Sequence, residues 1–314
     1  MPPARPLSPP TLAALFDQCR NWGRWGPADQ RGTLNYLTPE QTRRATALVR
    51  EGVTVSCALP LATTPDPHNP FPVLHHMLGD GDLEGATGSS DWFAVQPHGR
   101  SVTHLDALCH IFYRGQMYNG VPASQVTVRG AAANGIENVR TGIVGRGVLL
   151  DLPRWQGRGW LEPGEAITVE DLERAEQQAR VQVGEGDLLL VRTGQQARAR
   201  SGAPSPPPLP GRFPLPPLAG LEWTTLPWLH ERRIALLGGD TFSDCVPSGY
   251  TGAEGLPIHL VGIVAMGLHL LDNADLEALS EACAARGRWE FLLVIAPLIL
   301  ERGTASPVNP LAIF

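Results

Sequence analysis

The residues Thr-His-Leu-Asp-Ala-Leu-Cys-His (103–110) carry the strongest signal for the fold and its chemistry. In an extended strand, side chains two residues apart point to the same face, so His104, Asp106 and His110 share one face. The apolar residues between them predict a partly buried segment, and buried polar groups need partners. A His and an Asp on one face can bind a divalent cation, and a further His can transfer protons. The alternative is an ordinary hydrogen-bonded His–Asp pair.

The same stretch resembles the signature of the cyclase family of metal-dependent hydrolases, which includes bacterial kynurenine formamidase and isatin hydrolase. That signature is His-x-Gly-Thr-His-x-Asp-x-Pro-x-His. Four residues match it, namely Thr103, His104, Asp106 and His110. Three residues depart from it: Arg100 stands in place of the first His, Val102 in place of Gly and Leu108 in place of Pro.

The resemblance implies that His104 and Asp106 bind a divalent metal ion, Mn²⁺ or Zn²⁺, and that His110 is a general base or acid. The first His of the signature is usually a ligand as well, and Arg100 replaces it here. His98, two residues earlier, has the same strand parity and is a candidate replacement. Alternatively, Arg100 pairs with Asp106 in place of the metal, and the chain is a metal-free binding protein that keeps the fold.

A second group of polar residues is expected near the same site. The segment around His259 and the strand that ends at Asp272 resemble a second conserved region of the family, where a His and an acid help to hold a second metal. Asp272 could instead be the N-cap of a helix that starts near residue 274. Asp240 follows an apolar strand and two glycines, so it could orient a ligand or cap the following turn.

Strand-like and helix-like patterns alternate along the chain, which favours an α/β fold with at least partly parallel strands. Strands are predicted at residues 53–59, 147–151, 187–191, 234–237, 268–271 and 289–295, and helices at 39–51 and 169–179. The resemblance covers residues 20–314 and implies the family's swivelling β/β/α fold, with a β-barrel-like core flanked by helices. We therefore expect a flexible N-terminal arm over residues 1–20 and a single cyclase-like hydrolase domain over 21–314.

Two long stretches are rich in turn and loop residues. Residues 60–90 predict a long loop that carries His68, His75 and His76, and exposed loop histidines are the simpler interpretation of these three. Residues 203–220 are proline-rich, which excludes a helix or a central strand. A rigid surface excursion is expected there, and a flap over a pocket or a dimer arm is the functional alternative.

The composition indicates which classes of partner and which cellular compartment are expected. A net charge of −6 and scattered basic residues argue against nucleic acid or an anionic membrane as a partner. No apolar run reaches the ~20 residues of a transmembrane helix, and the proline-rich start is unlike a signal peptide. Five dispersed cysteines without a Cys-x-x-Cys pair favour reduced thiols, and a cytoplasmic protein is expected.

Together these features predict a metal-dependent hydrolase that cleaves the C–N bond of a small cyclic amide, imide or formamide with a metal-activated water. Hydrolysis of a lactone or ester, or a cyclisation, would use the same site, and the sequence does not separate these reactions. The family is often dimeric, so the resemblance also implies a homodimer.

Overall fold

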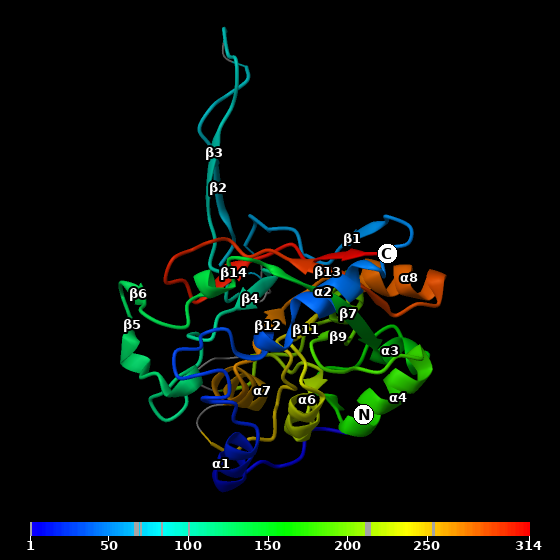
Figure 1. The fold of residues 1–314 in the computed structure, drawn as a ribbon. Coiled ribbons are helices and arrows are strands. Elements are labelled where there is room, and N and C mark those ends of the chain that lie inside the picture. Colours follow the sequence, from blue (N-terminus) through cyan, green and yellow to red (C-terminus); the bar gives the residue numbers. More distant parts are fainter. Residues whose placement is uncertain are drawn as a thin grey trace.

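The computed structural model describes residues 2–65, 69, 71–82, 84–99, 101–210, 215–252 and 255–314. Within these ranges, nine strands form one curled sheet (Figure 1). Their spatial order is β1 (Thr54–Ser56), β15 (Leu311–Ile313), β13 (Glu290–Ile295), β7 (Ile143–Asp151), β9 (Leu188–Arg192), β11 (Leu236–Gly239), β12 (His269–Asp272), β4 (His104–Asp106) and β14 (Ala305–Pro307). The central strands β7, β9, β11 and β12 run parallel, and the strands outside them pair antiparallel. The structure confirms the α/β class and places the predicted strands within one sheet.

Helices and short strands surround this sheet. The α-helices are α1 (Pro9–Gln18), α2 (Pro39–Thr46), α3 (Leu152–Trp155), α4 (Val169–Ala179), α5 (Gln195–Arg200), α6 (Leu226–Arg232), α7 (Pro257–His259) and α8 (Glu277–Arg286). The 3₁₀ helices are η1 (Gly32–Tyr36), η2 (Tyr118–Gly120), η3 (Ala123–Gln125), η4 (Ile136–Val139) and η5 (Trp223–Thr225), and η6 (Leu260–Met266) is a π-helical continuation of α7. Three small two-stranded sheets pair β2 (Leu74–Met77) with β3 (Asp91–Ala94), β5 (Val126–Thr127) with β6 (Gly130–Ala131), and β8 (Ala166–Ile167) with β10 (Gly220–Leu221).

The large sheet separates two apolar cores. On β7, Val148 and Leu150 face one core, which also contains residues of α1, α4, α6 and η6. Leu149, between them, faces the other core together with Leu279 of α8. Because successive strand residues point to opposite faces, a central strand covered on both sides is apolar throughout. None of the helices in the described ranges combines the length and apolar character that a membrane crossing requires.

Helix α2 begins as the sequence predicts and ends earlier. The Thr38 side chain accepts a hydrogen bond from the Gln41 N–H, and the Gln41 side chain accepts one from the Thr38 N–H. This capping box fixes the first turn. The helix ends at Thr46, and not near Glu51 as predicted, because the N–H groups of Leu48 and Val49 donate to carbonyls three residues earlier, in a turn. Beyond the turn, the N–H groups of Glu51 and Gly52 donate to the carbonyl of Phe314, which follows β15.

The N-terminal segment differs from the flexible arm expected over residues 1–20. Its residues 9–18 form α1, whose N-cap Ser8 side chain accepts a hydrogen bond from the Thr11 N–H. Leu12 and Leu15 of this helix are buried in the first core. The proline-rich composition concealed the helical spacing of these apolar residues, which gives α1 one buried face. The described part of the segment is therefore packed on the domain.

The stretch predicted as a long loop over residues 60–90 contains part of a β-hairpin. Strands β2 and β3 pair antiparallel and project away from the body of the protein (Figure 1). His75 and His76 lie exposed on β2, as expected, and His68 lies outside the described residues. The turn-rich composition hid these two four-residue strands. In the proline-rich stretch 203–220, residues 203–210 contain no regular element and most of them are exposed, and residues 211–214 lie outside the described ones. Pro216 and residues 218–220 are buried, and Gly220 begins β10, so the surface excursion is wrong for the end of the stretch.

Candidate metal centre

The predicted site begins on strand β4, which lies between β12 and β14. His104 and Asp106 share one face of this strand, and the imidazole Nε2 of His104 lies 3.4 Å from Oδ1 of Asp106. Leu105, between them, points to the second apolar core. Asp272 is the register partner of His104 on β12, which brings its carboxylate to the same place. The strand parity inferred from the sequence is thus confirmed for His104 and Asp106. It is wrong for His110, because β4 ends at Asp106 and the His110 N–H donates to the Ala107 carbonyl in the turn that follows.

Four histidines surround the carboxylate of Asp106, which is 1% exposed. On the Oδ1 side, His98 Nδ1 lies at 3.1 Å and His104 Nε2 at 3.4 Å. On the Oδ2 side, His259 Nε2 lies at 3.7 Å and His110 Nε2 at 4.0 Å. Neither carboxylate oxygen receives a hydrogen bond of acceptable geometry from the described residues. Asp106 is the centre of the cluster.

His98 is the candidate for the ligand that the sequence left unassigned, and it lies beside Asp106. Its Nδ1 faces Asp106, its Nε2 lies 2.9 Å from Oγ1 of Thr304, and its ring stacks on His110 with centroids 3.7 Å apart and planes 10° apart. The candidate replacement for the missing signature histidine therefore lies within the cluster. Arg100 is outside the described residues, so its alternative pairing with Asp106 stays a prediction.

His259 and Asp272 also lie in this cluster, and a further acid stands behind them. The His259 Nε2 is 3.2 Å from Oδ2 of Asp272, and its Nδ1 is 2.7 Å from Oδ2 of Asp244. Asp244 also accepts the N–H groups of Ile258 and His259 at the start of α7. The alternative that Asp272 is an N-cap is wrong, because Asp272 ends β12 and the N-cap residue of α8 is Leu276.

Sequence reasoning missed three residues that contact this cluster: Asp244, His269 and Thr304, which faces His98. Asp244 was hidden because it lies in an irregular segment after β11, four residues beyond the more conspicuous Asp240. His269 was hidden inside an apolar run. Its Nδ1–H donates to the main-chain carbonyl of Asp106 at 2.8 Å, which supports β4 from the neighbouring strand. Only the pairing of β12 with β4 reveals that contact.

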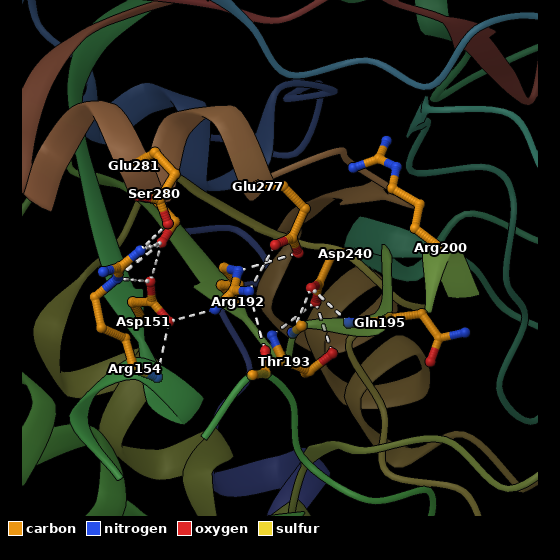
Figure 2. A network of polar contacts seen from close by, with 12 residues as sticks. Asp151, Arg154, Arg192, Thr193, Gln195, Arg200, Asp240, Glu277, Ser280 and Glu281 are labelled. Atoms are coloured by element: carbon orange, nitrogen blue, oxygen red, sulfur yellow. Dashed lines mark hydrogen bonds and ion pairs between the residues drawn. The ribbon is translucent and has the colours of Figure 1, made fainter. Parts of the chain in front are cut away.

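Asp240, by contrast, serves a different part of the molecule. Its carboxylate accepts hydrogen bonds from the N–H and the hydroxyl of Thr193 and from the N–H groups of Gly194 and Gln195. Figure 2 shows this group beside the ion pairs of Arg192 with Asp151 and Glu277. Asp240 therefore fixes the segment that links β9 to α5, and neither predicted role, orienting a ligand or capping the turn after β11, describes these contacts.

In the cluster, burial and the neighbouring charges shift the pKa values of the side chains in opposite directions. Burial favours the neutral acid at Asp106, but the nearby histidines, His110 foremost, hold its pKa well below the ordinary value. Burial also opposes a charge on His259, yet the carboxylates of Asp272 and Asp244 raise its pKa well above the ordinary value. At His110 burial prevails and lowers the pKa to about 3. Burial and the neighbouring carboxylates therefore shift the pKa values of His110 and His259 in opposite directions.

These residues fit a divalent metal ion. His98, Asp106 and His110 offer ligand atoms within 4.8 Å of one another, and so do His104, Asp106 and Asp272. Both oxygens of Asp106 and Oδ1 of Asp272 are buried without a hydrogen-bond partner among the described residues. Such carboxylates are costly unless a cation satisfies them. Imidazole nitrogens and carboxylate oxygens are ligands that Zn²⁺ and Mn²⁺ accept.

Comparison with known proteins places this arrangement in a family. The cyclase family model, described as "Putative cyclase", matches residues 32–244, which is more than half of the chain and includes the whole of β4. The chain belongs to the cyclase family. The crystal structure of a novel cyclase shares 32% identity with it at a TM-score of 0.82, over 94% of this chain and 99% of the other. That likeness confirms the fold expected for a cyclase.

More distant cyclase-fold structures share the architecture alone. Isatin hydrolase A from Labrenzia aggregata, bound to benzyl benzoate, is 19% identical with a TM-score of 0.56, over 85% of this chain and 94% of the other. Isatin hydrolase A from Ralstonia solanacearum is 22% identical with a TM-score of 0.57, over 86% and 93%. No curated protein matches the chain.

Proposed function

We propose that this cyclase-family protein is a metal-dependent hydrolase that cleaves the C–N bond of a small cyclic amide, imide or formamide. One observation carries the proposal: the buried carboxylate of Asp106 lies among four histidines and receives no hydrogen bond of its own from the described residues. Membership of the cyclase family supports it.

His104 and Asp106 are the ligands that we propose first, with His98 completing the set. The Nδ1–H of His104 donates to the carbonyl of Val102 at 2.8 Å, which leaves Nε2 turned toward Asp106 and free to bind the ion. A bound Mn²⁺ or Zn²⁺ supplies a Lewis acid that lowers the pKa of a water and polarises a carbonyl. His259 and Asp272 are the further ligands that we propose if a second ion binds, because His259 Nε2 lies 3.2 Å from Oδ2 of Asp272 and 3.7 Å from Oδ2 of Asp106.

His110 is the residue that we propose as the general base. Its side chain is 25% exposed, whereas that of His104 is 3% exposed, so it lies toward the open side of the cluster. There its Nε2 can accept a proton from the attacking water and return it to the leaving nitrogen. Because His110 also belongs to one candidate ligand set, its two possible roles need separate measurements.

Metal analysis tests the ligands. Purified protein should contain a divalent ion that is lost in His104→Ala and in Asp106→Ala and kept in His75→Ala, a control at an exposed histidine outside the cluster. Stoichiometric metal in both site variants would reject the ligand assignment.

The role of His110 is tested by His110→Ala. As a base, its loss should leave the metal content unchanged and reduce kcat by about 10²–10⁴-fold. Loss of the metal in this variant would make His110 a ligand, and turnover at the wild-type rate would reject both roles.

The bond that is cleaved requires a substrate panel. An activated water attacks any suitable carbonyl, so lactams, imides, formamides, lactones and esters should be assayed with the same metal-loaded protein. Hydrolysis restricted to lactones or esters would overturn the C–N assignment but would not contradict the proposed metal centre.

A further inference from the structure

His98 is held on three sides, although it lies outside the family signature. Asp106 faces its Nδ1 at 3.1 Å, Thr304 faces its Nε2 at 2.9 Å, and His110 stacks on its ring. The Thr304 contact and the stacking on His110 restrict the orientation of the ring, and Nδ1 is buried beside Asp106 without a hydrogen-bond partner among the described residues. The residue that fixes its outer nitrogen is Thr304, which is 206 positions away in sequence.

The position of Thr304 is itself fixed by the sheet. Its carbonyl accepts the N–H of Ala107 at 2.9 Å, and the next residue, Ala305, is the register partner of Asp106. Thr304 directly precedes β14, so the pairing of β14 with β4 fixes its hydroxyl relative to the Asp106 carboxylate. His98 lies between these two fixed points.

The main chain after His98 is anchored as well. The side-chain amide of Asn273, directly after β12, donates to the carbonyl of Gly99 at 2.7 Å and to that of Val102 at 3.3 Å. Asn273 therefore ties the segment between His98 and β4 to the neighbouring strand.

A metal-binding histidine commonly donates its second ring N–H to an oxygen acceptor, which fixes the tautomer and the ring orientation. At His104 that donor is Nδ1, directed to Val102, so the inward atom is Nε2. At His98 the arrangement is reversed: Nε2–H can donate to the Thr304 hydroxyl, and the inward atom is Nδ1.

We propose that Thr304 is a positioning residue that turns Nδ1 of His98 into the metal centre, so that His98 serves as the ligand that the signature places at residue 100. This inference rests on the proposed metal-binding function. It goes further by assigning the coordinating atom of His98 and by identifying a hydroxyl outside the signature that selects it.

Zinc affinity tests the proposal. Thr304→Val keeps the shape and removes the hydroxyl, and Thr304→Ser keeps the hydroxyl. In competition with a chromophoric chelator, Thr304→Val should bind Zn²⁺ about 10–100-fold more weakly than wild type, and Thr304→Ser should restore most of the affinity. The matched control is Thr42→Val, whose lost hydroxyl donates to the carbonyl of Val144. It should bind Zn²⁺ as wild type does.

A double-mutant cycle and a spectroscopic signature distinguish positioning from a loss of stability. If Thr304 acts through His98, adding Thr304→Val to His98→Ala should cost no further affinity. In the zinc-loaded, ¹⁵N-histidine-labelled protein, His98 should show a zinc-bound Nδ1 and a protonated Nε2. His104 should show the opposite pattern, and Thr304→Val should lose the His98 pattern.

Failure of this inference is distinct from failure of the proposed function. Zinc binding that needs His104 and Asp106 but is unchanged in Thr304→Val, or a His98 with a free Nδ1, overturns the positioning role alone. A wild-type protein that binds neither Zn²⁺ nor Mn²⁺ overturns both.

Discussion

Among the described residues, Asp244 contacts the candidate metal centre through His259. It accepts the Nδ1–H of that histidine and two main-chain N–H groups at the start of α7, so its carboxylate fixes both the imidazole and the helix end that carries it. Carboxylates that orient an imidazole in this way are common behind metal ligands and catalytic histidines.

Asp244→Asn should lower the pKa of His259 in metal-free protein, because one of the two carboxylates that raise it is lost. A pKa raised in the folded state gives stability that is fully present below the unfolded-state pKa, about 6.5, and is lost as pH rises through the folded value. As pH rises from about 6.5 through the folded value, metal-free wild type should therefore lose more stability than the variant. NMR titration of the His259 ring measures the shift, and an unchanged pKa would contradict it.

At this scale, local spacing predicted that His104 and Asp106 share a face of β4, because they are two residues apart on one strand, and this needs no tertiary knowledge. His98 and His110 lie outside β4, so tertiary folding and not strand parity brings their rings to Asp106. Asp244 and Thr304 could not be predicted in the same way. Their contacts arise where β11 and β14 bring distant segments beside the cluster, and a lone Asp or Thr in a loop has many ordinary roles.

Among the elements, the carboxyl ends of β7 and β9 carry a polar network instead of a ligand site. Arg192 at the end of β9 forms ion pairs with Asp151 at the end of β7 and with Glu277 of α8. Asp240, directly after β11, accepts four hydrogen bonds from the turn after β9. The sequence indicated that Asp240 is an acid at the end of a strand. It did not show whether this acid binds a ligand or belongs to a polar network, because in both cases an Asp follows an apolar run.

Asp240→Asn should destabilise the fold by about 2–4 kcal/mol, because the amide nitrogen would face N–H donors that now meet a carboxylate oxygen. Urea unfolding should show a lower midpoint at an unchanged slope. Asp17→Asn, at a 67% exposed side chain, is the control and should match wild type. Equal midpoints for all three proteins would show that the four hydrogen bonds add little.

At the scale of the whole molecule, the β2–β3 hairpin is a feature that the turn-rich composition of residues 60–90 did not predict. Leu74, Met77, Trp92 and Phe93 are 53%, 60%, 47% and 52% exposed on it. A two-stranded hairpin alone is marginally stable, and clustered exposed apolar residues commonly mark an interface. We propose it as the contact surface of the homodimer that the family resemblance implies.

Replacing Trp92 and Phe93 with Thr should convert a homodimer into a monomer, since both removed side chains are large and apolar. Analytical ultracentrifugation over a range of concentrations measures this. Leu298→Thr, at a 54% exposed leucine outside the hairpin, is the control and should leave the assembly state unchanged. A wild-type protein that is monomeric throughout would reject the homodimer.

Only residues 95–97 lie between the end of β3 and His98. A partner that immobilises the hairpin also restricts the main chain that leads to this proposed ligand, so association and metal binding become thermodynamically linked. Linkage is reciprocal: whatever factor the metal adds to the association constant, association adds to the metal affinity. Titrating the metal at rising protein concentration would measure how much association raises the metal affinity. Sedimentation with and without the metal would measure how much the metal raises the association constant.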